Sequence, residues 1–174
     1  MSLQLDPQIG AALYQLFGDA VAAPPPPPGD WKTRRDGVAP LFDVLATLRP
    51  LSPDVVTQEF ETTADDGHVL RLRWYTKTGS NPGSGVYYVH GGGMIFGSVD
   101  DYHAVVADYV ARSGVPMLTV EYRLAPEHPH PTPVEDSYSG LKWFAEHASE
   151  LGVDLARIAV MGDSAGGGSL HRWR

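Results

Sequence analysis

The stretch Ile158-Ala159-Val160-Met161-Gly162-Asp163-Ser164-Ala165-Gly166 decides how this chain is expected to fold. Its first four residues form an apolar run, and its last five have the pattern G-x-S-x-G. Between a strand and a helix, this pattern makes a sharp turn that lifts the serine oxygen above the sheet. The flanking small residues let two backbones pass closely there. The sequence therefore predicts that Ser164 is a nucleophile held on a strand-to-helix elbow.

Two earlier loops also follow strand-like runs. Val86-Tyr87-Tyr88-Val89 is β-prone and ends in His90-Gly91-Gly92-Gly93, a loop of the kind that supplies backbone donors to an oxyanion. The apolar run from Pro116 to Val120 precedes Tyr122-Arg123-Leu124-Ala125-Pro126-Glu127-His128-Pro129. With the elbow, these segments resemble the hormone-sensitive-lipase-like family of α/β-hydrolases, esterases marked by an H-G-G-G loop and a G-D-S-A-G-G elbow. The resemblance runs from about Val55 to Gly168.

The resemblance implies a serine carboxylesterase that hydrolyses short-chain carboxylic esters through an acyl-enzyme on Ser164. It assigns the oxyanion hole to the amides of Gly92, Gly93 and Ala165. The residue types agree, because the glycines leave the loop amides unobstructed and Ala165 begins the elbow helix. The implied substrate is a small-molecule ester, and no metal or other cofactor is expected. The alternatives are a catalytically inactive, small-molecule-binding or receptor-like relative, and a non-functional truncated fragment.

The acid and the histidine of the triad follow the serine in this architecture. The family continues after Gly168 as a long apolar helix and further strands, whereas this chain has the polar and basic residues 169–174. We therefore expect the chain to end just after the elbow and to lack both partners, through a frameshift, an early stop or a cloning boundary. Three adjacent glycines also disfavour a stable elbow helix. The elbow strand is expected to become a sheet edge.

The chain has seven histidines, and His68 and His147 carry no signal for a role as the missing base. His90 is expected to shape the H-G-G-G loop, and His171 lies too far along the elbow helix from the serine. Three others sit in or near loops on the substrate side, where a structural role and a role as base both stay open: His103, His128 and His130. Asp163 is expected to point away from Ser164 and support the elbow. Two residues are candidates for a substrate pocket or for ordinary packing: Met94 and Phe96.

The pattern of the remaining sequence predicts an α/β fold, the N-terminal part of an α/β-hydrolase fold with a mostly parallel sheet and helices on both faces. The expected strands after residue 50 are Val55 to Thr63, Val69 to Thr76, Val86 to Val89 and Pro116 to Glu121. The expected helices are Asp100 to Ser113 and about Val134 to Ala148. Residues 51–174 form this domain. Residues 1–50 are expected to form cap helices joined by a stiff arm, Pro24 to Pro28.

The charge and cysteine content of the chain argue against several classes of partner and site. The chain has 13 Lys and Arg against 21 Asp and Glu, a formal charge of −8, which argues against nucleic acid and anionic membranes. It has no cysteine, which excludes disulfides, zinc-thiolate sites and a cysteine nucleophile and fits a reducing compartment. Met1 to Gly18 has neither the basic region nor the apolar core of a signal peptide or membrane span. We expect a cytoplasmic protein, with self-association through the open sheet edge as a further candidate.

Overall fold

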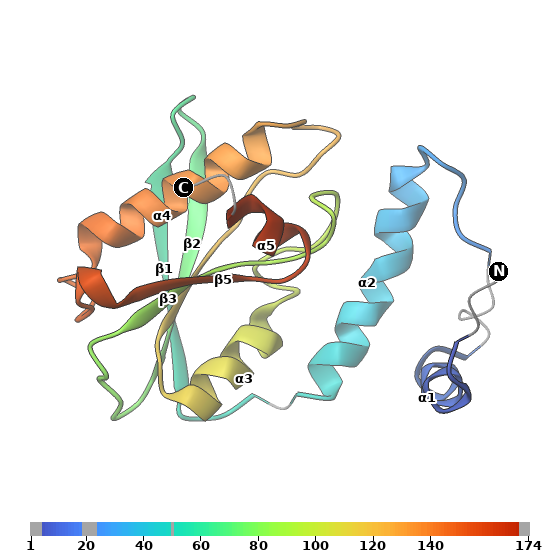
Figure 1. Ribbon diagram of the computed structural model, residues 1–174, viewed down its shortest axis with the longest axis horizontal. Coiled ribbons are helices and arrows are strands. Elements are labelled where there is room, and N and C mark those ends of the chain that lie inside the picture. The colour runs from blue at the N-terminus through green and yellow to red at the C-terminus, as the bar shows by residue number, and fades with distance from the viewer. Residues whose placement is uncertain (1–4, 19–23, 50, 171–174) are drawn as a thin grey trace.

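The computed structural model describes residues 5–18, 24–49 and 51–170. Within these residues one sheet has the strand order β1-β2-β4-β3-β5. Its strands are β1 (Val55–Thr63), β2 (Val69–Lys77), β3 (Gly85–Val89), β4 (Met117–Val120) and β5 (Ile158–Gly162). Strand β2 pairs antiparallel with β1 and β4, whereas β3 pairs in parallel with β4 and β5. Only β2 therefore runs against the other strands, and the predicted mostly parallel sheet is confirmed (Figure 1).

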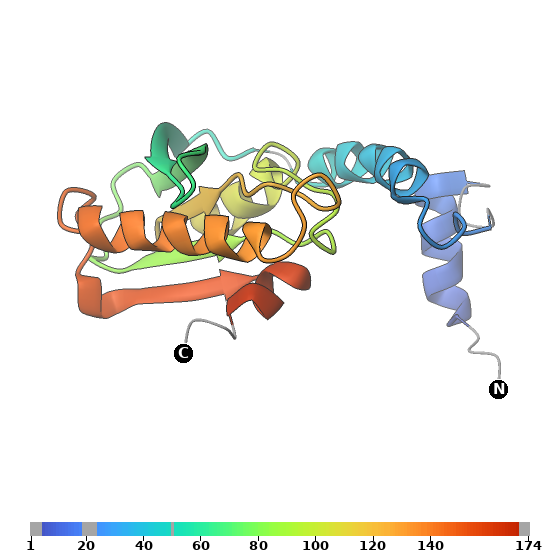
Figure 2. The same cartoon turned by 90° about the horizontal axis from the view of Figure 1, so that it is seen from above.

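Helices cover both faces of this sheet, as the sequence predicts. Helix α3 (His103–Ser113) and helix α4 (Thr132–His147) lie on opposite sides of the strands (Figure 2). Successive side chains of a strand point to opposite faces. In β3, Tyr87 accordingly packs in the cluster that contains Phe144 of α4, and Tyr88 packs in the cluster that contains Val110 of α3. The sheet is thus the middle layer of three.

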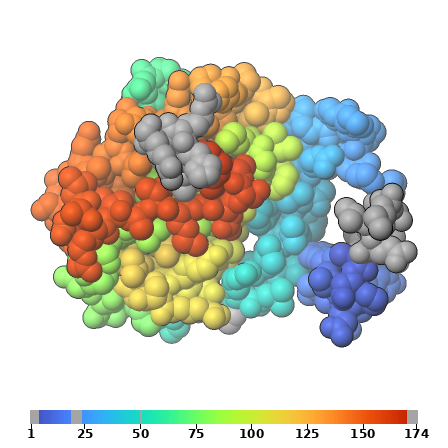
Figure 3. Space-filling model, viewed as in Figure 1, coloured from blue at the N-terminus to red at the C-terminus, as the bar shows by residue number. Residues whose placement is uncertain are grey.

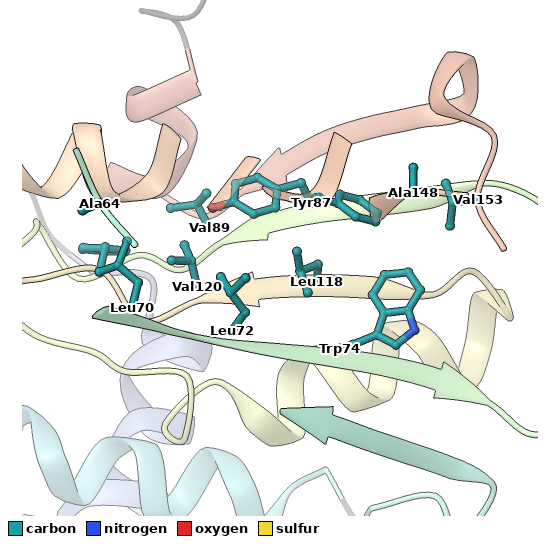
Figure 4. Packing of buried hydrophobic residues seen from close by; sticks show 12 residues of the cluster. Ala64, Leu70, Leu72, Trp74, Tyr87, Val89, Leu118, Val120, Ala148 and Val153 are labelled. Carbon is teal, nitrogen blue, oxygen red and sulfur yellow. The ribbon is translucent and has the colours of Figure 1, made fainter. Parts of the chain in front are cut away.

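The larger core lies on the α4 face. Leu72, Leu118 and Tyr87 of three neighbouring strands are fully buried there beside Phe144 (Figure 4). Burial of a side chain of this size contributes about 1.5–3 kcal/mol. The Tyr87 hydroxyl donates a hydrogen bond of 2.6 Å to the backbone oxygen of Ser137, so this polar atom is paired inside the core. The packing fixes the carboxyl ends of β3 and β4, from which the predicted loops leave.

Two helices precede the sheet. Helix α1 (Pro7–Phe17) and helix α2 (Trp31–Thr47) begin at the N-caps Asp6 and Asp30, whose carboxylates accept backbone amides of the first turn. Neither helix contains a fully buried residue. Helix α2 lies beside the body of the molecule, and α1 lies on its outer side (Figures 1 and 3). None of the helices in the described ranges has the length and the apolar character that a membrane crossing requires.

One expectation is wrong. The glycines after the elbow do not prevent a helix, because α5 spans Ala165–Leu170. Ser169 of this helix is buried, and its hydroxyl donates to the backbone oxygen of Ala165. The elbow strand β5, by contrast, pairs with β3 alone among the described strands, so its predicted position at the sheet edge is confirmed. Helix propensity therefore does not decide the conformation of this segment.

Candidate active site

The two loops singled out by the sequence leave the sheet side by side. Strands β3 and β5 are parallel neighbours, and Val89 pairs with Gly162 at their carboxyl ends. The next residues, His90 and Asp163, therefore enter the H-G-G-G loop and the elbow from adjacent positions. The Asp163 amide donates a 3.3 Å hydrogen bond to the Val89 oxygen. Ligands of open α/β sheets bind at this end of the strands.

Ser164 occupies a constrained backbone position. Its φ is 48°, in the left-handed region that a residue with a side chain adopts at a cost of about 1–2 kcal/mol. The Gly166 amide donates to the Asp163 oxygen at 2.8 Å, and the Gly168 amide donates to the Ser164 oxygen at 3.1 Å. These bonds turn the chain directly from β5 into α5. The serine is exposed at the tip of the turn, as the elbow pattern predicts.

Close backbone approach explains the glycines of the elbow. A Cβ on Gly166 would lie 2.1 Å from the Val89 oxygen and 2.6 Å from the His90 oxygen. A Cβ on Gly162 would lie 2.7 Å from the Gly166 carbonyl carbon. No real side chain fits at such distances. The first turn of α5 therefore packs directly on the end of β3, and this contact favours the helix despite its poor intrinsic propensity.

The H-G-G-G loop is a tight turn around Gly92. The amides of Ile95 and Phe96 both donate to the Gly92 oxygen, at 3.0 and 3.1 Å. Gly92 has a φ of 120°, and a Cβ there would lie 1.9 Å from the Phe96 oxygen. At the start of the loop, a Cβ on Gly91 would lie 3.0 Å from the Asp163 oxygen, so the loop touches the elbow. The turn requires glycine at position 92 for conformation and for space.

Three backbone amides in the H-G-G-G loop and the elbow have no acceptor within the described residues. In the part of the chain that the structure describes, the amides of Gly92, Gly93 and Ala165 make no hydrogen bond. Gly92 is buried, whereas Gly93 is exposed. Most buried backbone amides in proteins are paired, so unpaired donors at the end of a sheet call for a ligand or solvent acceptor. A developing negative charge on a carbonyl oxygen is one such acceptor.

His90 has the loop-shaping place expected from the sequence. It is 2% exposed, and its ring stacks on Tyr122 with 4.2 Å between the ring centroids. Its Nδ1 lies 2.8 Å from the Gly91 oxygen, and the Tyr122 hydroxyl donates to the His90 backbone oxygen at 3.0 Å. Burial lowers the pKa of His90. The imidazole thus joins the H-G-G-G loop to the segment after β4.

Asp163 also has neighbours away from the nucleophile. Burial raises the pKa of the Tyr88 phenol, and the nearby Asp163 carboxylate adds to the effect. The pKa of Tyr102 is raised by the same two causes in the same order. Both tyrosines pack on the α3 face of the sheet. The influence of Asp163 on these two phenols is in line with the supporting role predicted for it.

The described residues do not bring a base to Ser164. Within them, no hydrogen bond joins the Ser164 hydroxyl to a histidine or a carboxylate. His103 contacts the Tyr75 hydroxyl at 3.2 Å, and the rings of His68 and His128 lie 6.4 Å apart. His171, which the sequence analysis argues against as the base, lies outside the described residues. The H-G-G-G loop and the elbow thus lie at adjacent strand ends, whereas no proton acceptor for Ser164 is identified among the described residues.

A polar cleft of about 420 Å³ opens beside this region. It is lined by Arg35, His68, Val69, Arg71, Glu121, Tyr122, Arg123, Leu124, Glu127 and His128. None of these residues belongs to the elbow or to the H-G-G-G loop, so the cleft is separate from Ser164. The arginines in it are paired with carboxylates. No motif or periodic pattern in the sequence indicates that Arg35, from a distant helix, takes part in this region.

Comparison with known proteins identifies similar chains. A family model described as the alpha/beta hydrolase fold matches residues 86–172. Carboxylesterase NlhH of Mycobacterium tuberculosis is 40% identical over 126 residues, which cover 71% of this chain and 39% of the relative. Ethyl acetate hydrolase of Pseudomonas putida is 38% identical over 118 residues, 66% of this chain and 37% of the relative. The chain therefore spans less than half the length of these curated relatives.

Solved structures of esterases are also similar to this chain. A hyperthermophilic esterase from Pyrobaculum calidifontis superposes with a TM-score of 0.81 at 34% identity, covering 96% of this chain and 52% of that one. A bacterial heroin esterase gives a TM-score of 0.79 at 35% identity, covering 95% of this chain and 50% of that one. The likeness extends over α1 and α2 as well as the sheet, because nearly all of this chain is aligned.

Proposed function

Because the chain belongs to the hormone-sensitive-lipase-like family of α/β-hydrolases, we propose that it carries the nucleophile and the oxyanion-binding parts of a serine carboxylesterase. Ser164 is the proposed nucleophile. The amides of Gly92, Gly93 and Ala165 are the proposed oxyanion donors. The substrate class is a small-molecule, short-chain carboxylic ester, in line with the names of the relatives.

The proposed reaction has two steps. The Ser164 hydroxyl oxygen attacks the ester carbonyl carbon while a base removes its proton, and the carbonyl oxygen becomes an oxyanion. Collapse of this intermediate breaks the bond to the alcohol, which leaves with a proton, and an acyl group stays on Ser164. Water then attacks the acyl-enzyme and releases the carboxylic acid. The three amides would stabilise the oxyanion in both steps, and loss of one such donor typically costs about 3 kcal/mol.

One observation carries this proposal. The in-register pairing of Val89 with Gly162 brings the H-G-G-G loop and the elbow to adjacent strand ends, where the three amides have no acceptor within the described residues. Neither loop alone would make an oxyanion site. The left-handed Ser164 adds an independent argument, because strained backbone of this kind clusters at functional sites.

We further propose that residues 1–50 act as a cap beside this site and residues 51–174 as the hydrolase part. Bonds from α2 to the backbone of Ile95 and Ala125 support the cap assignment. The cytoplasmic location expected from the cysteine-free sequence stays a prediction, and so does self-association through β5.

A second candidate function is binding without turnover. It is favoured by one observation, the exposed Ser164 hydroxyl that has no histidine or carboxylate partner among the described residues. Without a base, a serine hydroxyl is a poor nucleophile at its ordinary pKa. The unpaired amides would still attract an anion or a polarised carbonyl. The chain would then act as a receptor-like binding protein for small carboxylates or esters.

Hydrolysis of p-nitrophenyl butyrate distinguishes the two candidates. Alone, the chain should exceed the rate in water by about 10³-fold at most, because oxyanion stabilisation outlasts loss of the triad. Added imidazole supplies the missing base, and it should raise the rate of the wild type above that of Ser164→Ala. Ser149→Ala, at another exposed serine, is the matched control and should behave as the wild type. Equal rates for the wild type and Ser164→Ala with imidazole would favour binding alone.

A further inference from the structure

Arg35 of α2 contacts the proposed oxyanion loop across 60 residues of sequence. Its Nε donates to the Ile95 backbone oxygen at 2.6 Å, and one Nη donates to the Ala125 backbone oxygen at 3.0 Å. The remaining donors bind the Glu127 carboxylate at 2.7 and 2.9 Å. One guanidinium thus joins three elements: α2, the H-G-G-G loop and the segment after β4.

The bond to Ile95 acts on the geometry of the glycines. The Ile95 amide donates to the Gly92 oxygen, and the Ile95 oxygen accepts from Arg35. Both backbone polar groups of Ile95 are therefore hydrogen-bonded. Met94, which lies between Gly92 and Ile95 in the chain, has a left-handed φ of 62°, and its oxygen accepts the Ala125 amide at 2.8 Å. Displacement of Ile95 would therefore reorient the peptide planes of Gly92 and Gly93, whose amides are the proposed donors.

Helix α2 also supports the other end of this loop. The Phe42 ring packs on Tyr102 with 5.5 Å between centroids. The Tyr102 hydroxyl in turn lies 2.9 Å from the position that a Cβ on Gly91 would take. The loop is therefore held at its start through Phe42 and at its end through Arg35. Both contacts come from the same face of one helix.

The set of acceptors around position 35 favours arginine over lysine. A planar guanidinium directs its donors in fixed directions, so it can bind the Glu127 carboxylate with two nitrogens and still donate to both carbonyls. An ammonium group carries its three donors on one atom and has no such fork. The Trp31 ring, 4.6 Å from the guanidinium carbon, supports the plane. The hydrogen bond with Glu127 raises the pKa of Arg35, and the same bond lowers the pKa of Glu127 to about 2. The pair is charged at neutral pH.

We infer that Arg35 is a positioning residue for the proposed ester hydrolysis, which sets the oxyanion loop from the cap helix α2. The inference rests on the proposed function for the role of Gly92 and Gly93. Its structural part, the hold on the loop, does not depend on that role. The side chains of Arg35 and Glu127 are 28% and 44% exposed, and ion pairs this exposed add little to global stability. Substitution of Arg35 should therefore loosen the loop without lowering the stability of the whole chain.

Amide hydrogen exchange tests the hold on the loop. In Arg35→Gln and in the milder Arg35→Lys, the hydrogen-bonded amides of Ile95 and Phe96 should exchange about tenfold faster, since local opening sets exchange rates. Exchange in α4 and the melting temperature should stay as in the wild type. Arg34→Gln is the matched control, because the neighbouring Arg34 is exposed and donates only a 3.5 Å bond to the Pro26 oxygen. Unchanged loop exchange in both Arg35 variants would overturn the inference, and so would equal loosening of the whole chain.

Glu127→Gln separates the carbonyl bonds from the ion pair. This variant removes the charge of the partner but leaves the Ile95 and Ala125 oxygens in place, so loop exchange should change less than about twofold. An effect as large as that of Arg35→Gln would assign the hold to the ion pair and overturn the role given to the carbonyl bonds.

A kinetic measurement tests the positioning role. With imidazole present, both Arg35 variants should lose about tenfold in kcat while KM stays within about twofold, because oxyanion donors act in the transition state. A raised KM with unchanged kcat would contradict positioning of the donors. If Ser164→Ala matches the wild type, the proposed function fails, and hydrogen exchange alone then decides whether Arg35 holds the loop.

Discussion

Val89 and Gly162 pair in register across the parallel strands β3 and β5, and this pairing creates the candidate site. It places the first residues of the H-G-G-G loop and of the nucleophile elbow next to each other. The elbow glycine Gly166 then contacts the Val89 backbone directly. A shift of one residue in this register would separate the loops and turn each β5 side chain to the other face of the sheet. The site thus depends on backbone packing.

Gly166→Ala should damage the elbow, whereas Gly168→Ala should not. An added Cβ at position 166 would lie 2.1 Å from the Val89 oxygen, and forced repacking of this kind should cost at least about 2 kcal/mol. At position 168 the added Cβ would meet nothing within 4 Å among the described residues outside its own helix backbone, and alanine favours a helix by up to about 1 kcal/mol. Denaturant unfolding measures both changes. Equal stability of the two variants would contradict the described packing of α5 on β3.

Asp136→Ala should be among the most destabilising single changes. The Asp136 carboxylate is fully buried and accepts the Arg123 backbone amide, Nε and Nη2 at 3.0, 2.8 and 2.6 Å. Its removal takes these three acceptor contacts away and leaves the Arg123 guanidinium with Asp66, whose side chain is 57% exposed, as its remaining described carboxylate partner. Loss of a buried ion-pair partner of this kind costs about 3–5 kcal/mol.

The matched control for this change is Asp36→Ala. Asp36 pairs with Lys32 on the exposed face of α2, and such a pair is worth about 0.5 kcal/mol or less. Thermal or denaturant unfolding compares the two variants. A loss below about 1 kcal/mol for Asp136→Ala would show that the pair does not hold the loop after β4.

Stability should fall as the pH is lowered from about 7.5 to about 5.5. Burial lowers the folded-state pKa of His90 and of His103 below the ordinary value near 6.5. Below pH 6.5 the unfolded chain therefore binds more protons, and acid favours unfolding. Melting temperatures across this range measure the effect, and an NMR titration should find the His90 midpoint below the ordinary value near 6.5. A melting temperature that rises on acidification, or a His90 midpoint above the ordinary value, would contradict this account.

Self-association should use β5 and not the opposite edge strand β1. Strand β1 carries the charged residues Glu59 and Glu61, which discourage edge pairing, whereas β5 has no charged residue. Val160→Lys should therefore lower the association measured by sedimentation velocity. Val56→Lys is the control, since Val56 is 52% exposed on β1 and Val160 is 40% exposed on β5. Equal association of both variants and the wild type would exclude pairing through β5.

Local patterns predict much of this fold. The strand predicted from Val55 to Thr63 has the observed bounds of β1, and Gly67, in the turn before β2, has the positive φ of 87° that glycine readily adopts. Motifs of consecutive residues likewise predict the elbow and the H-G-G-G loop, because their geometry depends on neighbours in the chain. Helix α5 could not be predicted in this way, since its glycines are favoured by contact with β3.

Contacts between segments far apart in the sequence could not be predicted from local patterns either. Arg35 binds Ile95, and Arg123 binds Asp66 and Asp136, through single side chains that follow no periodic pattern. Any of the 13 basic residues was an equal candidate before the topology was known. The proton acceptor for Ser164 is a relationship of the same kind, since triad residues lie close in space and far apart in sequence.

The central claim is that Ser164 is the nucleophile of the site formed by the two loops, and acyl transfer tests it most directly. The chain is incubated with p-nitrophenyl butyrate and imidazole, and the modified residue is located by peptide mass spectrometry. The account predicts a butyryl group on Ser164, absent from Ser164→Ala and retained in Ser149→Ala, because a slow second step lets the acyl-enzyme accumulate. Labelling spread over surface residues and unchanged in Ser164→Ala would contradict the account.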